Sequence, residues 1–270
     1  MIMMKIKLVA LDLDDTLLDS KRIISPRTRQ AIQDAVAQGV MVTVATGRMH
    51  VSALPYAQQL GLDVPIITYN GALIKSSLSG EVLSSRPVPR PVMDEVLALF
   101  RANGWYLQLH IGDTLYVKER NERVRLYEET AGVKAEVVGD GLYSVPGEAS
   151  KMLTIAEPET IQAIRRQLLQ DGFGERLSMA ISKPHYLEMT CLGVNKGWAL
   201  DFLANKLQIG RDAVMAVGDS QNDLDMIEYA GLGVAMGNAS ETVKAAAQAV
   251  TRGHDEDGVA EAIEKYVLGR

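Results

Sequence analysis

Two acidic residues, Asp12 and Asp14, stand at the end of an apolar run that begins at Ile6. Side chains alternate along a β-strand, so the two carboxylates begin on the same side of the chain. Neighbouring carboxylates repel each other and need a cation or a shared proton between them. The pair therefore indicates cation binding or acid–base chemistry. Taken alone, it leaves open a strand followed by an acidic turn that caps a helix.

Three more groups of polar residues could take part in the same chemistry. Thr46 and Gly47 follow another apolar run, and a hydroxyl beside a glycine turn can bind a phosphoryl oxygen. Lys196 can neutralise a phosphate as a point charge. Asp219 and Asp223 add hard oxygen ligands of the kind that Mg²⁺ prefers. Each group can also be interpreted without any role in chemistry: as a helix cap, a surface lysine or a polar loop.

The elements around these residues explain how they could meet. The segments 6–13, 40–46 and 213–219 are apolar and read as strands buried on both faces, as in a parallel sheet. Helices are expected between them, one starting at Ser25-Pro26 and stopping at Gly39. Each polar group follows such a strand or opens a helix. Open α/β sheets bind ligands at the carboxyl ends of their strands, so we expect the groups to share one edge.

The middle of the chain has a different pattern of helix and strand signals. A proline-rich stretch at 86–91 looks like a hinge, and amphipathic helices mixed with hairpin signals follow it. The alternation of strand and helix signals resumes after Cys191. We therefore expect a split catalytic core, residues 1–83 and 191–270, with a second domain inserted at 84–190.

The composition restricts the class of protein. The chain has 270 residues and a formal net charge of −6, which argues against broad nucleic-acid binding. The apolar start is short and runs into carboxylates, so we expect neither a signal peptide nor a membrane span. The single cysteine, Cys191, cannot form an internal disulfide and is expected to be structural. The expectation is a cytoplasmic protein, either a monomer or a homodimer.

Considered together, the motifs resemble those of the haloacid dehalogenase superfamily of phosphatases. The acidic pair, Thr-Gly-Arg, the lysine and the GD-x-x-ND pattern occur in this order. The resemblance is closer to the Cof-type group, which includes YidA-like sugar phosphatases. Its motifs are TYNGA (68–72), VNKGWAL (194–200), GDSQNDLDMIEYAGLGVAMGNA (218–239) and EDGVAEAIEKYVL (256–268). The resemblance implies an α/β fold, a Rossmann-like parallel-sheet core with an inserted α/β cap.

The resemblance also implies roles for these residues. Asp12 would attack phosphorus and form an aspartyl-phosphate, and Asp14 would act as general acid and then as general base. Thr46 would bind the phosphoryl group and Lys196 would neutralise its charge. The implied substrate-binding residues are Thr46, Gly47, Asn70, Gly71, Lys196 and Asn222. The implied Mg²⁺ ligands are Asp12, the backbone carbonyl of Asp14, and Asp219, with Asp223 in support.

The chain departs from the commonest family pattern at Asp15, where many members have glycine, so the turn should be less free to adopt positive φ. An inserted cap would close over the site and contact the leaving group. The residues of the insert that could make such contacts are His110, Tyr116, Lys118, Arg120, Arg123 and His185. For each of them, an ordinary place in a helix or hairpin is the more frequent outcome.

The leading interpretation is hydrolysis of a small phosphorylated metabolite, with sugar phosphates as the expected class. A phosphomutase of the same superfamily is the nearest alternative. A non-catalytic protein that senses a phosphorylated metabolite is a third possibility, which the intact set of Asp12, Asp14, Lys196 and Asp219 disfavours. The physiological substrate depends on the inserted segment, where residue matches mean least.

Overall fold

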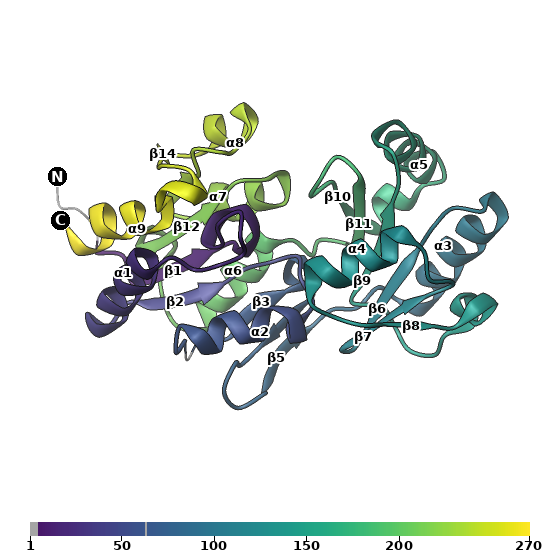
Figure 1. The fold of residues 1–270 in the computed structure, drawn as a ribbon, viewed down its shortest axis with the longest axis horizontal. Helices are drawn as coiled ribbons and strands as arrows, with labels where there is room; N and C mark the ends of the chain where they lie inside the picture. Colours follow the sequence, from purple (N-terminus) through teal and green to yellow (C-terminus); the bar gives the residue numbers. More distant parts are fainter. Residues whose placement is uncertain (1–4, 63) are drawn as a thin grey trace.

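A computed structural model describes residues 5–62 and 64–270, and Figure 1 shows that these form two lobes. The first lobe is built on a five-stranded parallel sheet in the order β14-β13-β12-β1-β2. The sheet confirms the expected α/β class. Its strands are β1 (Leu8–Leu11), β2 (Met41–Val44), β12 (Val214–Gly218), β13 (Leu232–Ala235) and β14 (Ala249–Val250).

Helices cover both faces of this sheet. Alternate residues of β1 face opposite sides: Val9 and Leu11 belong to one apolar cluster, and Leu8 and Ala10 to another. Both faces are therefore buried, which is why the strand reads as a continuous apolar run. The helices of this lobe are α1 (Pro26–Ala37), α2 (His50–Gln59), α6 (Lys196–Lys206), α7 (Leu224–Tyr229), α8 (Glu241–Ala246) and α9 (Gly258–Ile263).

The first helix begins and ends where the sequence predicts. Ser25 caps α1 by accepting a hydrogen bond from the backbone N–H of Thr28 at 3.0 Å, and Pro26 occupies the first helical position. Gly39 lies just beyond the helix at φ +81°, a backbone conformation that glycine adopts at little cost.

The segment 65–74, which reads in the sequence as a strand with a glycine turn inside it, forms two strands separated by that turn. It divides into β3 (Ile66–Thr68), a tight turn over Tyr69–Gly71, and β4 (Leu73–Lys75). With β5 (Val82–Ser85) these strands make a small antiparallel sheet. Positive φ angles at three successive residues, Tyr69, Asn70 and Gly71, reverse the chain and break the strand.

The second lobe contains a six-stranded sheet in the order β10-β11-β9-β6-β7-β8. Its strands are β6 (Gln108–Ile111), β7 (Thr114–Val117), β8 (Ala135–Val137), β9 (Lys151–Ile155), β10 (Leu177–Ala180) and β11 (Tyr186–Cys191). Its helices are α3 (Arg90–Asn103), α4 (Glu122–Ala131) and α5 (Pro158–Gln170). The short strand β8, which pairs in parallel with β7, has no signal in the sequence.

Apolar and polar contacts join the two lobes. Met49 and Tyr69 of the first lobe pack in one cluster with Leu115 and Tyr127 of the second. The Tyr69 hydroxyl donates a hydrogen bond to the carbonyl of Gly112 at 2.8 Å. The domain boundaries at 84 and 190 stay a prediction. Within residues 5–62 and 64–270, none of the helices is both long and apolar enough to cross a membrane.

Candidate active site

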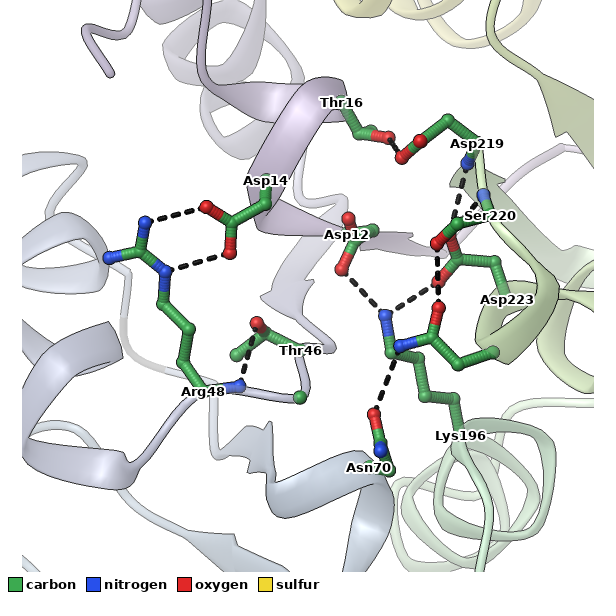
Figure 2. Close-up of polar contacts among 12 residues, drawn as sticks. Asp12, Asp14, Thr16, Thr46, Arg48, Asn70, Lys196, Asp219, Ser220 and Asp223 are labelled. Atoms are coloured by element: carbon green, nitrogen blue, oxygen red, sulfur yellow. Dashed lines mark hydrogen bonds and ion pairs between the residues drawn. The ribbon is translucent and has the colours of Figure 1, made fainter. Parts of the chain in front are cut away.

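The polar groups expected to share one edge of the sheet do so. Asp12 directly follows β1, Thr46 lies just beyond β2, and Asp219 directly follows β12. Strand β1 pairs with both of the other strands, so their carboxyl ends lie next to one another. Figure 2 shows the side chains converging there, with Lys196 reaching in from α6. This placement is the one that the parallel-sheet argument predicts.

Lys196 lies between two carboxylates. Its ammonium group donates to Asp12 Oδ1 at 2.6 Å and to Asp223 Oδ1 at 2.5 Å (Figure 2). The Lys196 side chain has no solvent exposure. The two carboxylates raise the pKa of Lys196 although burial opposes this, so the lysine is charged. It is the first residue of α6, and Asn195 caps that helix by accepting from the Trp198 N–H at 2.7 Å.

One lysine does not balance the negative charge of the site. Ligand atoms of Asp12, Asp219 and Asp223 lie within 4.8 Å of one another. Burial and the charge of Asp223 raise the pKa of Asp12 to about 7 despite Lys196. Burial and the charges of Asp12 and Asp223 raise the pKa of Asp219 to about 9. A buried carboxylate cluster with raised pKa values is chemically suited to a divalent cation, which hard oxygen ligands bind.

Asp223 also holds the loop that carries Asp219. Its second oxygen accepts hydrogen bonds from the backbone N–H groups of Asp219 and Ser220, both at 3.0 Å. A Cβ atom on Gly218 would lie 2.5 Å from the Cβ of Asp223, so only glycine fits at that position. Thr16 donates to Asp219 Oδ1 at 2.8 Å from the other side. The loop is therefore fixed before any ligand binds.

Asp14 has a cationic partner, Arg48, which is not among the residues expected at the site. Arg48 holds the Asp14 carboxylate with two hydrogen bonds, of 2.8 Å from Nε and 2.6 Å from Nη2 (Figure 2). Burial acts to raise the pKa of Asp14, but the hydrogen bonds and charge of Arg48 outweigh it and lower the pKa. The sequence signal that could have pointed to this partner is the place of Arg48 in the Thr-Gly-Arg motif.

Some of the residues expected to bind substrate line a pocket, and others pack against the residues that surround it. Thr46, Gly47 and Asn222 line a pocket of about 90 Å³ together with Asp12, Asp14 and Asp219. Asn70 stands beside it, accepting from Asn222 Nδ2 at 3.1 Å. Gly71 lies against α6 instead, where a Cβ atom would be 2.5 Å from the Asn195 carbonyl oxygen.

Residues 9–263 match the family model described as haloacid dehalogenase-like hydrolase. The chain belongs to this family. It is 34% identical over 266 residues to the 5-amino-6-(5-phospho-D-ribitylamino)uracil phosphatase YcsE of Bacillus subtilis, covering 97% of this chain and 96% of that one. Relatives of this kind and the family match identify it as a Cof-type phosphatase, a phosphoric monoester hydrolase.

Solved structures of the family have the same fold. A haloacid dehalogenase-like hydrolase from Bacteroides thetaiotaomicron superposes with a TM-score of 0.87 at 32% identity, covering 97% of this chain and 99% of that one. The subclass IIB sugar phosphatase BT4131 gives a TM-score of 0.85 at 26% identity, covering 96% and 98%. The overall fold of the chain therefore has direct counterparts among solved structures.

The second lobe contributes to the pocket with residues other than the six candidates. Of those candidates, His110 is fully buried, Arg120 pairs with Glu128, and Lys118 and Arg123 line a separate pocket. Neither Tyr116 nor His185 is among the described residues that line the catalytic pocket. The second-lobe residues that do line it are Tyr127, Thr130, Ala131, Lys151, Ser182, Lys183, Tyr186 and Glu188. No spacing pattern in the sequence pointed to them.

Asp15 adopts φ +58° although it is not glycine. The left-handed region is a few times more frequent for Asp and Asn than for most other residues. Asn238 donates to the Asp15 carbonyl oxygen at 2.9 Å and so holds this conformation. The turn therefore adopts positive φ with aspartate in place of glycine, and the lower freedom of aspartate in this turn stays a prediction.

The buried position of Lys196 leads to a stability prediction. Lys196→Met removes the cation that two buried carboxylates share, so we expect the free energy of unfolding of the metal-free phosphatase to fall by about 3 kcal/mol at neutral pH. Urea unfolding measures this. The matched control is Lys206→Met, at the exposed end of the same helix, which should change the free energy by less than about 0.5 kcal/mol. Equal effects of the two substitutions would contradict the charge argument.

Proposed function

We propose that the protein hydrolyses small phosphate monoesters in a Mg²⁺-dependent reaction with a phosphorylated Asp12 as intermediate. The observation that carries the proposal is the ion pair between buried Lys196 and Asp12, 2.6 Å long, at the edge of a pocket that also contains Asp14 and Asp219. A carboxylate that attacks a phosphate dianion meets like-charge repulsion. A fixed lysine and a cation beside it reduce that repulsion.

The reaction proceeds in two displacements. In the first, an Asp12 carboxylate oxygen forms a bond to phosphorus, the bond from phosphorus to the ester oxygen breaks, and Asp14 gives that oxygen a proton. In the second, Asp14 takes a proton from water as the water oxygen attacks phosphorus, which frees Asp12 and releases phosphate. Thr46 and Asn222, which line the pocket, are suited to bind the phosphoryl oxygens.

Asp12, Asp219 and the backbone of Asp14 would hold Mg²⁺, with Asp223 in support. The bound ion would supply positive charge to the phosphoryl oxygens and to the nucleophile. The raised pKa values of Asp12 and Asp219 support this assignment, because these carboxylates need a counter-charge to ionise together at neutral pH.

The ion pair of Asp14 with Arg48 fits the second displacement. Arg48 holds Asp14 in the ionised form, which is the form that accepts a proton from water. For the first displacement Asp14 must carry a proton, so we infer that substrate binding loosens its bonds to Arg48. A loosened pair would let one residue act first as acid and then as base.

A sugar phosphate or a related polyol phosphate is the proposed substrate class. One relative is named for a substrate with a phosphorylated ribityl chain, and a structural neighbour is named a sugar phosphatase. A mutase would return the phosphate to another hydroxyl, and analysis of the products separates the two reactions. We further propose that segment 84–190 is the cap over this site and that the protein is cytoplasmic and does not bind nucleic acid.

Asp12→Asn tests the nucleophile. Because an amide oxygen cannot form a stable acyl-phosphate here, we expect kcat/KM for an aryl phosphate with Mg²⁺ to fall at least about 1,000-fold. Asp171→Asn, at an exposed position of the second lobe, is the control and should retain activity. Full activity in Asp12→Asn would rule out the proposed intermediate.

Asp14→Asn tests the acid and base. We expect turnover to fall by about 100- to 10,000-fold, the usual range for loss of general acid–base catalysis. An aryl phosphate has a good leaving group and needs little protonation, so phosphorylated enzyme should accumulate. Rapid-quench measurement of phosphate bound to protein would detect it. Unchanged turnover would remove Asp14 from the mechanism.

The raised pKa values predict how Mg²⁺ stabilises the protein at different pH. Asp12 and Asp219 ionise at about pH 7 and about pH 9 in the folded chain but near 3.8 when unfolded, so the folded chain holds more protons between these values. The metal-free protein should therefore lose stability as pH rises through that window.

Because Mg²⁺ competes with those protons, its stabilising effect should grow with pH. We expect the increase in Tm on adding Mg²⁺ to be several degrees larger at about pH 8.5 than at about pH 5.5. Asp219→Asn should reduce the increase at the higher pH. An increase that is the same at both pH values would contradict the carboxylate assignment.

A further inference from the structure

A second buried ion pair lies beside the catalytic residues and takes no part in the mechanism above. Lys151 and Glu188 lie on β9 and β11, neighbouring strands of the second lobe (Figure 1). Their Nζ and Oε1 atoms are 3.0 Å apart, and their side chains are only 2% and 5% exposed. Both line the same pocket as Asp12 and Asp14.

This pair touches the loops that carry the phosphate-binding groups. Lys151 Nζ donates to the carbonyl oxygen of Gly47 at 2.6 Å. Glu188 Oε2 accepts a hydrogen bond from the side-chain amide of Asn70. A Cβ atom on Gly47 would lie 2.8 Å from Asn70 Oδ1 and 3.4 Å from Glu188 Oε2, so glycine lets the two lobes approach here. The pair therefore lies on the second-lobe side of the pocket, directly against the loops that carry Gly47 and Asn70.

Both charged groups have unused hydrogen-bonding capacity. Within residues 5–62 and 64–270, the Lys151 ammonium has two acceptors, Gly47 and Glu188, and it can donate three hydrogen bonds. Glu188 accepts from Lys151 and Asn70, although a carboxylate has about four acceptor positions. A hydroxyl group both accepts and donates, so it can bind to this pair without leaving either charge unpaired.

Stability alone does not account for the pair. Replacing a buried ion pair with apolar residues of similar volume is often neutral or stabilising, because the ions lose their hydration on burial. Aromatic rings of Tyr127 and Tyr186 also line the pocket, so an apolar pair would have packing partners. A charged pair facing a reaction pocket is better explained by recognition of a polar ligand.

We propose that Lys151 and Glu188 bind hydroxyl groups of the leaving group and thereby select phosphate monoesters of polyols and sugars. This inference rests on the proposed function and assigns the residues that determine its specificity. A leaving group without hydroxyls leaves the remaining N–H of Lys151 and the free positions of Glu188 without a partner from the substrate. Sites built to hydrogen-bond a substrate hydroxyl reject analogues that lack it strongly.

The test compares two esters with the same carbon number, erythritol 4-phosphate and n-butyl phosphate. For the unmodified enzyme with Mg²⁺ we expect kcat/KM to favour the erythritol ester by at least about 100-fold. In Glu188→Gln and in the double variant Lys151→Met/Glu188→Leu, this preference should fall to less than about 10-fold. The preference is the ratio of the two kcat/KM values, and most of its fall should come from the erythritol ester.

Glu128→Gln is the matched control. Glu128 is another buried glutamate of the second lobe, on α4, where it accepts hydrogen bonds from Arg120 and from the Ala135 N–H. It is not among the described residues that line the catalytic pocket, so its substitution should leave the preference unchanged. The double variant leaves no unpaired buried charge, and a thermal unfolding scan of each variant establishes that it is folded.

Three results would overturn the inference. One is an unmodified enzyme that hydrolyses both esters equally, and another is a preference that survives in both variants. The third is a parallel fall in the rates for both esters, which would assign the pair to holding the lobes together. In each case Mg²⁺-dependent turnover that is lost in Asp12→Asn would still support the proposed function. Absence of turnover with every ester, including the aryl phosphate, would overturn both.

Discussion

The pairing of Lys196 with Asp12 and Asp223 is the interaction on which the rest of the site depends. Three carboxylates meet within 4.8 Å in a largely buried position, and one lysine offsets only part of their charge. Without Lys196 the like charges would oppose the folding of the chain. With it, a deficit of positive charge remains, so the raised pKa values of Asp12 and Asp219 are the electrostatic basis for expecting a divalent cation.

The position of that lysine is set by close packing between helices and loops. A Cβ atom on Gly197, the residue after Lys196, would lie 2.4 Å from the Asp225 carbonyl oxygen on α7. Gly71 approaches the Asn195 carbonyl just before α6, and Gly218 approaches Asp223. Three glycines therefore let α6, α7 and the loops come together. A site assembled from distant parts of the chain needs such close contacts to hold charged atoms at fixed distances.

The sequence was sufficient to bring three groups of the first lobe to one edge of the sheet, because the signal for each of them is local. Asp12, Thr46 and Asp219 each follow an apolar strand, and parallel strands bring their carboxyl ends together. The second-lobe residues Lys151 and Glu188 carry no local signal, because pairing between strands 37 residues apart brings them together. The two hydrogen bonds from Arg48 to Asp14 were not predicted for a similar reason. An arginine on the surface and an arginine that pairs with a carboxylate look alike in a sequence.

The contacts between the lobes suggest why chemistry and selectivity can vary separately. Asp12, Lys196 and the loop that carries Asp219 and Asp223 all belong to the parallel-sheet lobe, where glycines and buried charges tolerate little change. The second lobe reaches this site through a few polar contacts, such as Lys151 with Gly47 and Ser52 with the Ala131 carbonyl, together with one apolar cluster. A substitution on its pocket-facing strands can therefore change which leaving group fits without displacing Asp12 or Lys196.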